Sequence, residues 1–129
     1  MLNEQVKQLL KDQLWYLATS SDEPNAVPVA FKDVAEDGTL LVGDVFLDTT
    51  LKNIQANGKI AVSACNGSTM EGYQIKGTAR YVTEGPVVDT FKKLVEDMFH
   101  GAATAKGALL ITPERVIVTT PGADNKKEL

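Results

Sequence analysis

Cysteine and histidine are almost absent from this chain, whose 129 residues include one of each, Cys65 and His100. One cysteine excludes an internal disulfide. One cysteine and one histidine are also too few for a zinc site of the usual composition. Nothing in the sequence brings the two side chains together, so it does not predict a cysteine nucleophile with a histidine base.

Positive charge is scarce as well. The chain has 13 lysines and arginines against 17 aspartates and glutamates, a formal net charge of −4, and its basic residues form no cluster. Nucleic acids and anionic membrane surfaces attract basic patches, so neither is expected as a main partner. Apolar runs of the roughly 20 residues that cross a membrane are missing, and residues 1–11 lack the apolar centre of a signal peptide. We therefore expect a cytoplasmic protein.

Glycine-rich phosphate motifs and paired catalytic carboxylates are missing too. The glycines at positions 43, 67, 72 and 77 form neither the G-x-G-x-x-G pattern nor a Walker pattern, so a Rossmann or P-loop site is not predicted. The carboxylates are dispersed along the chain, and no general acid or base stands out.

The chain instead has the composition of one globular domain, with 43% hydrophobic and 23% charged residues. Hydrophobic periodicity predicts helices over residues 2–13, 50–56 and 86–99. Alternating patterns predict strands over residues 15–20, 26–32, 39–43, 60–64, 73–81, 108–112 and 116–120. Short strands joined by tight turns indicate an antiparallel barrel or sandwich. Pro28 lacks an N–H group, which favours an edge position for its strand.

Residues 44–63 carry the most specific local signal. Thr49 and Thr50 stand where a short helix begins, and Asn57-Gly58 gives it a left-handed end. The first N–H groups of a helix have no intrahelical partner and the helix dipole is positive there, so this start is placed to bind a phosphate. A plain N-cap is the alternative, with Asp48 or a threonine as the capping residue.

Four segments, in this order, resemble a known family. They are Asn-Ala-Val-Pro-Val-Ala-Phe at 25–31, Leu-Leu-Val-Gly-Asp-Val-Phe at 40–46, Thr-Thr-Leu-Lys-Asn-Ile-Gln-Ala-Asn-Gly-Lys-Ile-Ala-Val at 49–62, and Tyr-Gln-Ile-Lys-Gly-Thr-Ala-Arg-Tyr at 73–81. Their order and spacing are similar to the FMN-binding split-barrel family related to pyridoxamine 5'-phosphate oxidase, in particular its small single-domain members. The resemblance covers about residues 5–120.

The resemblance implies a mainly β (α+β) fold, a six-stranded antiparallel split barrel with short flanking helices. It implies a domain over residues 1–121 followed by a polar tail at 122–129, which we expect to be loosely held. It also implies a homodimer with FMN in a groove at the interface. Carried over by position, the FMN-binding residues are Pro28, Val29, Ala30, Asp44, Val45, Phe46, Thr49, Thr50, Lys52, Asn53, Gln74 and Lys76.

Within this set the resemblance divides the roles. Residues 28–30 and 44–46 would meet the ring and ribityl chain, and Thr49, Thr50, Lys52 and Asn53 the phosphate. Gln74 and Lys76 would serve the polar edge of the ring. Relatives commonly have Lys-Thr at the helix start, whereas this chain has Thr49-Thr50. Two outcomes stay open: the phosphate is held more weakly, or Lys52, Lys76 or Arg80 replaces the missing charge.

The function implied is an FMN-dependent oxidoreductase or electron-transfer protein acting on an unidentified redox partner or substrate. The flavin would carry out the redox step, and no catalytic side chain is predicted. Three alternatives stay open at this point. They are a non-enzymatic flavin carrier or sensor, a split barrel that binds another ligand such as haem, and a structural dimer without a ligand.

Overall fold

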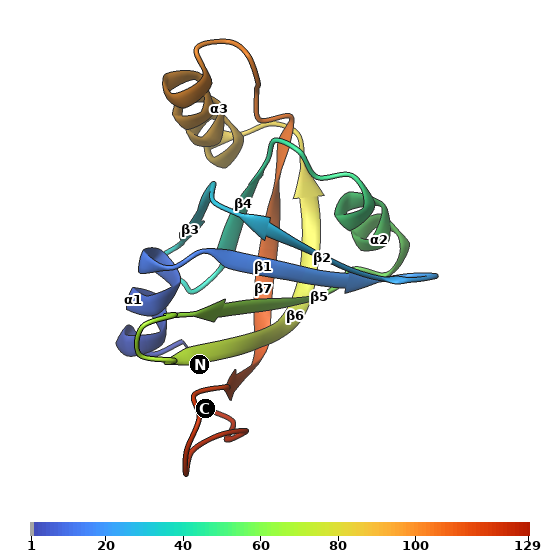
Figure 1. Cartoon of the computed structure of the whole chain (residues 1–129). Coiled ribbons are helices and arrows are strands. Elements are labelled where there is room, and N and C mark those ends of the chain that lie inside the picture. Colours follow the sequence, from blue (N-terminus) through green and yellow to red (C-terminus); the bar gives the residue numbers. More distant parts are fainter. Residues whose placement is uncertain (1) are drawn as a thin grey trace.

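A single antiparallel sheet of seven strands forms most of the molecule. The computed structural model describes residues 2–129, and in it the sheet has the strand order β2-β1-β5-β6-β7-β4-β3. The strands curl into an open barrel with three helices at its margins (Figure 1). The strands are β1 (Trp15–Ser20), β2 (Pro24–Val29), β3 (Lys32–Val34), β4 (Leu40–Asp44), β5 (Lys59–Cys65), β6 (Gly72–Val82) and β7 (Gly107–Val118). The helices are α1 (Glu4–Asp12), α2 (Thr49–Asn57) and α3 (Pro86–Phe99).

The predicted split barrel is confirmed, with seven strands rather than six. The strand expected at 26–32 ends at Val29, and a separate short strand, β3, follows at Lys32–Val34. β2 pairs only with β1, which confirms the edge position inferred from Pro28, while β3 pairs only with β4. Between them the chain crosses from one edge of the sheet to the other, and the carbonyl of Phe31 accepts a hydrogen bond from the N–H of Gly43. The barrel is therefore split between β2 and β4, with a short crossing segment at the opening.

The last strand was expected as two pieces, and this prediction is wrong. β7 runs continuously through Pro113, which lies opposite Gly77 where the pairing with β6 shifts register. A proline is tolerated inside a strand at such a bulge, because the local ladder bond is already missing. The first part of β7 pairs with β4 on its other side, through residues 107–111.

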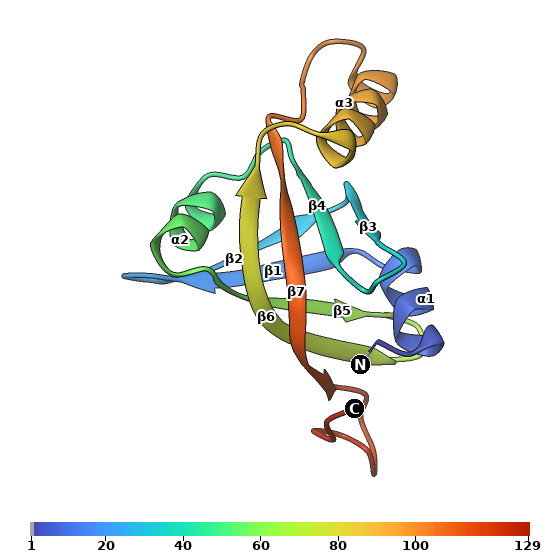
Figure 2. The ribbon, with the colours of Figure 1, turned by 180° about the vertical axis from the view of Figure 1, so that it is seen from behind.

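Two hydrophobic clusters fill the molecule. The larger one lies inside the barrel and includes Trp15, Leu17 and Ile75, with Leu10 of α1 and Ile54 of α2 closing its ends. The smaller one lies between α3 and the outer ends of β4 and β7. Figure 2 shows α3 standing apart from the other two helices, beyond the ends of β4 and β7. None of the helices within residues 2–129 has the length and apolar character needed to cross a membrane.

The C-terminal tail is more ordered than expected. It folds back so that the N–H groups of Lys126 and Leu129 donate to the carbonyls of Val118 and Val116. Arg115 forms an ion pair with Glu128. The tail thus covers the stretch of β7 edge that lies beyond β4, where unpaired backbone groups would otherwise remain.

Candidate functional site

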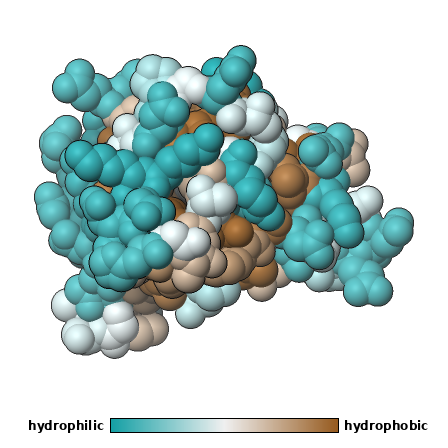
Figure 3. All heavy atoms as spheres, turned by 90° about the horizontal axis from the view of Figure 1, so that it is seen from above, coloured by the Kyte–Doolittle hydropathy of each residue, from teal (hydrophilic) through white to brown (hydrophobic). Residues whose placement is uncertain are grey.

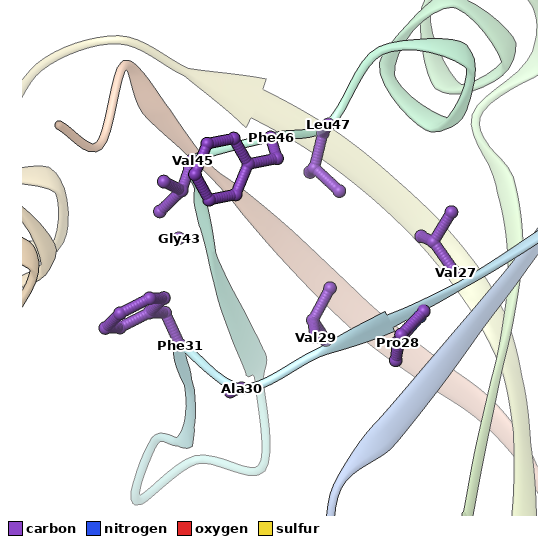
Figure 4. Close-up of a pocket in the computed structure, with 9 residues that line it drawn as sticks. All are labelled: Val27, Pro28, Val29, Ala30, Phe31, Gly43, Val45, Phe46 and Leu47. Atoms are coloured by element: carbon purple, nitrogen blue, oxygen red, sulfur yellow. The ribbon is translucent and has the colours of Figure 1, made fainter. Parts of the chain in front are cut away.

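A groove of about 410 Å³ lies at the split of the barrel. One wall comes from β2 and the crossing segment, and the other comes from the end of β4 and the loop that follows it (Figure 4). The residues that line it are Val27, Pro28, Val29, Ala30, Phe31, Gly43, Val45, Phe46 and Leu47. All nine are apolar, so the polar groups they offer to a ligand belong to the backbone. Such a groove suits a flat, largely apolar body held by backbone hydrogen bonds at its edges.

The two walls face each other directly. Val29 and Leu47 point toward one another across the opening (Figure 4). At Gly43 the chain has no room for a side chain on the other side, because a Cβ atom would lie 2.8 Å from the ring of Phe91 in α3. This close approach places α3 against the end of β4, immediately beside the groove.

Aromatic rings form one end of the groove. Phe46 is 77% exposed, a high value for a side chain of its size. Its ring stands edge-on to that of Phe99, and Phe99 also packs against Phe31 at a centroid distance of 6.0 Å. Seen from above, the molecule has apolar surface from the middle to the lower part of the view, between hydrophilic side chains on the left and right (Figure 3). Exposed apolar surface of this kind marks a binding surface.

Asp44 ends β4 directly before the loop that forms the second wall. Its side chain is fully buried, at 0% exposure. One carboxylate oxygen accepts from the Tyr81 hydroxyl at 2.6 Å, and the other accepts from the N–H of Leu47 at 3.1 Å. Burial, followed by this hydrogen bond, raises the pKa of Tyr81 to about 12. Both oxygens of the carboxylate are therefore engaged by contacts within the chain.

The helix α2 begins where the groove ends. Thr49 is its first residue, and the preceding Asp48 makes no side-chain capping bond within the described chain. Asp48 instead pairs with Lys52 at 3.3 Å, on the exposed side of the helix. The helix start confirms the predicted position. The first-turn N–H groups are thus not capped by the Asp48 side chain, whose negative charge is compensated by Lys52.

The two threonines at this start differ in direction. Thr49 is exposed, whereas Thr50 is 1% exposed and accepts a hydrogen bond from the Asn25 side chain at 3.0 Å. Asn53, one turn later, is also buried and donates to the hydroxyl of Thr19 at 3.1 Å. Thr50 and Asn53 therefore fix α2 onto the β1–β2 hairpin, and Thr49 with Lys52 faces outward.

Gln74 and Lys76 lie away from this groove. They are on the outer face of β6, in register with Ser63 and Ala61 of β5. The alternation predicted for residues 73–81 is confirmed, with Tyr73, Ile75 and Gly77 buried and Lys76 and Thr78 exposed. Within one chain, the groove therefore has no contribution from Gln74 or Lys76 among its nine lining residues.

The structure thus brings together five of the twelve predicted residues, Pro28, Val29, Ala30, Val45 and Phe46, as walls of one groove. The sequence reasoning missed four further lining residues, Val27, Phe31, Gly43 and Leu47. Three of them, Val27, Phe31 and Gly43, lie inside the segments that carried the family resemblance. A prediction that included every residue of those segments would have found these three. Cys65 is exposed at the end of β5, and His100 ends α3 in a left-handed conformation.

Comparisons with known proteins agree with this arrangement. The model of the pyridoxamine 5'-phosphate oxidase family matches residues 2–121. Protein MJ0282 of Methanocaldococcus jannaschii is 32% identical over 130 residues, covering 98% of this chain and 86% of the relative. HupZ of Group A Streptococcus is 28% identical, with a TM-score of 0.82 and coverage of 96% of this chain and 98% of that one. An FMN-binding protein of Syntrophomonas wolfei has the same fold at 16% identity, with a TM-score of 0.81 and coverage of 93% and 87%.

Proposed function

The chain belongs to the pyridoxamine 5'-phosphate oxidase family, and from this premise we propose that it is a flavoprotein. It binds FMN non-covalently and passes electrons or hydride to a redox partner or a small-molecule substrate. One observation carries the proposal above the others: the chain passes from the last lining residue of an apolar groove, Leu47, to a helix start that the side chain of Asp48 does not cap. A ring and a phosphate joined by a short chain match these two environments.

The groove fits the ring part of the cofactor. Its apolar lining excludes water from a flat ring, and the backbone of residues 28–30 and 45–46, apart from the missing N–H of Pro28, supplies donors and acceptors for the ring's polar edge. The flavin supplies the redox chemistry, and the protein contributes binding, orientation and exclusion of solvent. Asp44 contributes to this site by fixing the loop, since its carboxylate is engaged by Tyr81 and Leu47.

The start of α2 fits the phosphate. Thr49 is exposed at this helix start, and the exposed Lys52, which pairs with Asp48, can exchange that contact for one with the phosphate. Charge-assisted hydrogen bonds are roughly twice as strong as neutral ones. Lys52 is therefore our proposed replacement for the lysine that relatives commonly carry at the helix start.

We further propose that the protein is a homodimer. The outer faces of β2, β1 and β5 are in register and present small or flat side chains to solvent, among them Ala26, Pro28, Tyr16 and Ala18. Such a face suits a flat contact between two copies, in which each patch meets the same patch of its partner. Gln74 and Lys76 lie on the same side of the sheet, two strands further along. In the proposed dimer they serve the groove of the second copy.

The proposal is tested by the visible spectrum of the purified protein and by titration with FMN and riboflavin. We expect flavin absorption, and we expect FMN to bind more tightly than riboflavin, which has the same ring but no phosphate. Thr49→Val should reduce affinity for FMN about tenfold, the value of a hydrogen bond to a charged group, and leave riboflavin affinity unchanged. A colourless protein that takes up neither compound contradicts the proposal.

A flavin carrier is the second function that the site supports. Because all nine lining residues are apolar, the groove contributes no side chain for proton transfer. Anaerobic titration of the flavin-loaded protein with NADH or NADPH separates the two functions. Rapid bleaching of the flavin bands supports an oxidoreductase, and unchanged bands with reversible FMN release support a carrier.

A further inference from the structure

Asp44 and Tyr81 lie at the junction of three elements. Asp44 ends β4, Tyr81 lies near the end of β6, and the backbone carbonyl of Asp44 accepts from the N–H of Lys106, just before β7. Residues 45–47, which leave this junction, provide three of the groove's lining residues. A change in the direction of the chain at Asp44 would therefore move one whole wall of the groove.

The carboxylate of Asp44 is costly to bury, and the structure balances it with hydrogen bonds rather than with a cation. The ion pairs found within residues 2–129 join Lys7 to Glu4, Lys52 to Asp48, and Arg115 to Glu128. A buried charge without a cation depends on its hydrogen-bond donors. Here those donors are the Tyr81 hydroxyl and the Leu47 N–H, and each satisfies one carboxylate oxygen.

The space for this contact is reserved by a glycine. A Cβ atom at Gly107 would lie 2.4 Å from the hydroxyl oxygen of Tyr81 and 2.6 Å from the carbonyl oxygen of Val82. The absence of a side chain at this position of β7 lets the Tyr81 hydroxyl reach Asp44 across the end of the sheet. Contacts among β4, β6 and β7 thus hold the short loop at residues 45–47 in place.

We propose that Asp44 and Tyr81 are positioning residues for the flavin site, which set the place of residues 45–47 against the ring before the ligand binds. The inference rests on the proposed function for its ligand, and on the contacts within the chain for its geometry. A wall that is fixed in advance saves the cost of ordering it on binding, and this saving appears as affinity. The contribution concerns the ring, so it is the same for FMN and for riboflavin.

The test uses two matched variants of the full-length protein, Tyr81→Phe and Tyr73→Phe. Tyr73 lies on the same strand and its hydroxyl likewise donates to a carboxylate, Glu71, at 2.7 Å, but it is not part of the groove. We expect Tyr81→Phe to lower affinity for both FMN and riboflavin about tenfold, and to speed hydrogen exchange at the Leu47 amide by a similar factor. Tyr73→Phe should change neither quantity.

The outcomes separate this inference from the proposed function. The positioning role is overturned if both variants lose the same amount of flavin affinity. It is also overturned if the hydrogen-exchange rate of the Leu47 amide is unchanged in Tyr81→Phe. If the unmodified protein binds neither FMN nor riboflavin, the proposed function fails. The exchange rate then still shows whether the pair fixes the loop. If it does, the same comparison is repeated with whichever ligand the groove is found to bind.

Discussion

The ring of Phe46 meets that of Phe99 edge-on, with the centroids 6.3 Å apart and the ring planes at 85°. Phe46 follows β4 and Phe99 ends α3, so this contact joins the loop of one groove wall to the helix beside it. Edge-to-face pairs of this kind add attraction beyond the area they bury. The contact supports an aromatic side chain that is otherwise open to solvent.

Replacement of Phe46 tests whether this exposed ring contacts the ligand. We expect Phe46→Ala to weaken FMN binding about five- to tenfold, because part of a phenyl ring's burial on binding is lost. Stability should change little, since the side chain is mostly exposed in the free protein. The matched control is Met70→Ala, which removes a side chain of 51% exposure in the turn before β6. Isothermal titration of both variants with FMN checks the prediction. If Phe46→Ala binds FMN as tightly as Met70→Ala, Phe46 does not contact the ligand.

Thr50→Val tests the buried threonine at the start of α2. The change keeps the shape but removes the acceptor of the Asn25 amide, so we expect the free energy of unfolding to fall by about 1–3 kcal/mol. Urea unfolding measures this loss. Thr50→Ser keeps the hydroxyl and serves as the control. A Thr50→Val protein as stable as its parent would show that the hydrogen bond to Asn25 contributes nothing to folding.

The Tyr81 hydroxyl predicts a specific response to alkali. Its pKa is about 12 in the folded chain, above the ordinary value of 10.0. Between these values the unfolded chain releases the proton while the folded chain keeps it, so this group's stabilising contribution is complete below pH 10 and is lost as the pH rises toward 12. The stability difference between the parent protein and Tyr81→Phe should therefore shrink over this range. Urea unfolding at a series of pH values measures it, and a constant difference would contradict the assigned pKa.

Gly107→Ala tests the space kept for Tyr81. The new methyl group would overlap both the Tyr81 hydroxyl and the Val82 carbonyl, and we expect a loss of about 1–3 kcal/mol in the free energy of unfolding. At Gly67 a Cβ atom would meet nothing within 4 Å, so Gly67→Ala is the control and should be nearly neutral. If the two variants unfold at the same denaturant concentration, β7 can move enough to accept a side chain at position 107.

Much of the fold could be predicted because it depends on local patterns. The alternation along β6 and the Asn57-Gly58 end of α2 reflect properties of neighbouring residues, and both were found from the sequence. The division of the strand expected at 26–32 could not be found in this way. It depends on the Phe31–Gly43 hydrogen bond at the sheet opening. Likewise Pro113 interrupts the sequence pattern but not the strand, because Gly77 on the neighbouring strand accommodates the bulge.

The candidate site, like the fold, could be predicted only where it depends on neighbouring residues. The start of α2 was located from its residues, but which threonine faces outward depends on where Asn25 of the β1–β2 hairpin lies. Asp44 and Tyr81 are 37 positions apart, and no spacing rule connects them. The roles of Gln74 and Lys76 depend on a second copy of the chain, and they stay predictions.

All the lining residues of the groove lie within residues 27–47, yet this segment cannot build the groove alone. Its two walls belong to distant places in the sheet order, and β1, β5, β6 and β7 lie between them. β4 is held on its inner side by β7, which starts at Gly107, sixty positions after the last lining residue. The groove therefore exists only in the assembled sheet, and an isolated peptide of residues 27–47 would lack the pairing that holds its second wall in place.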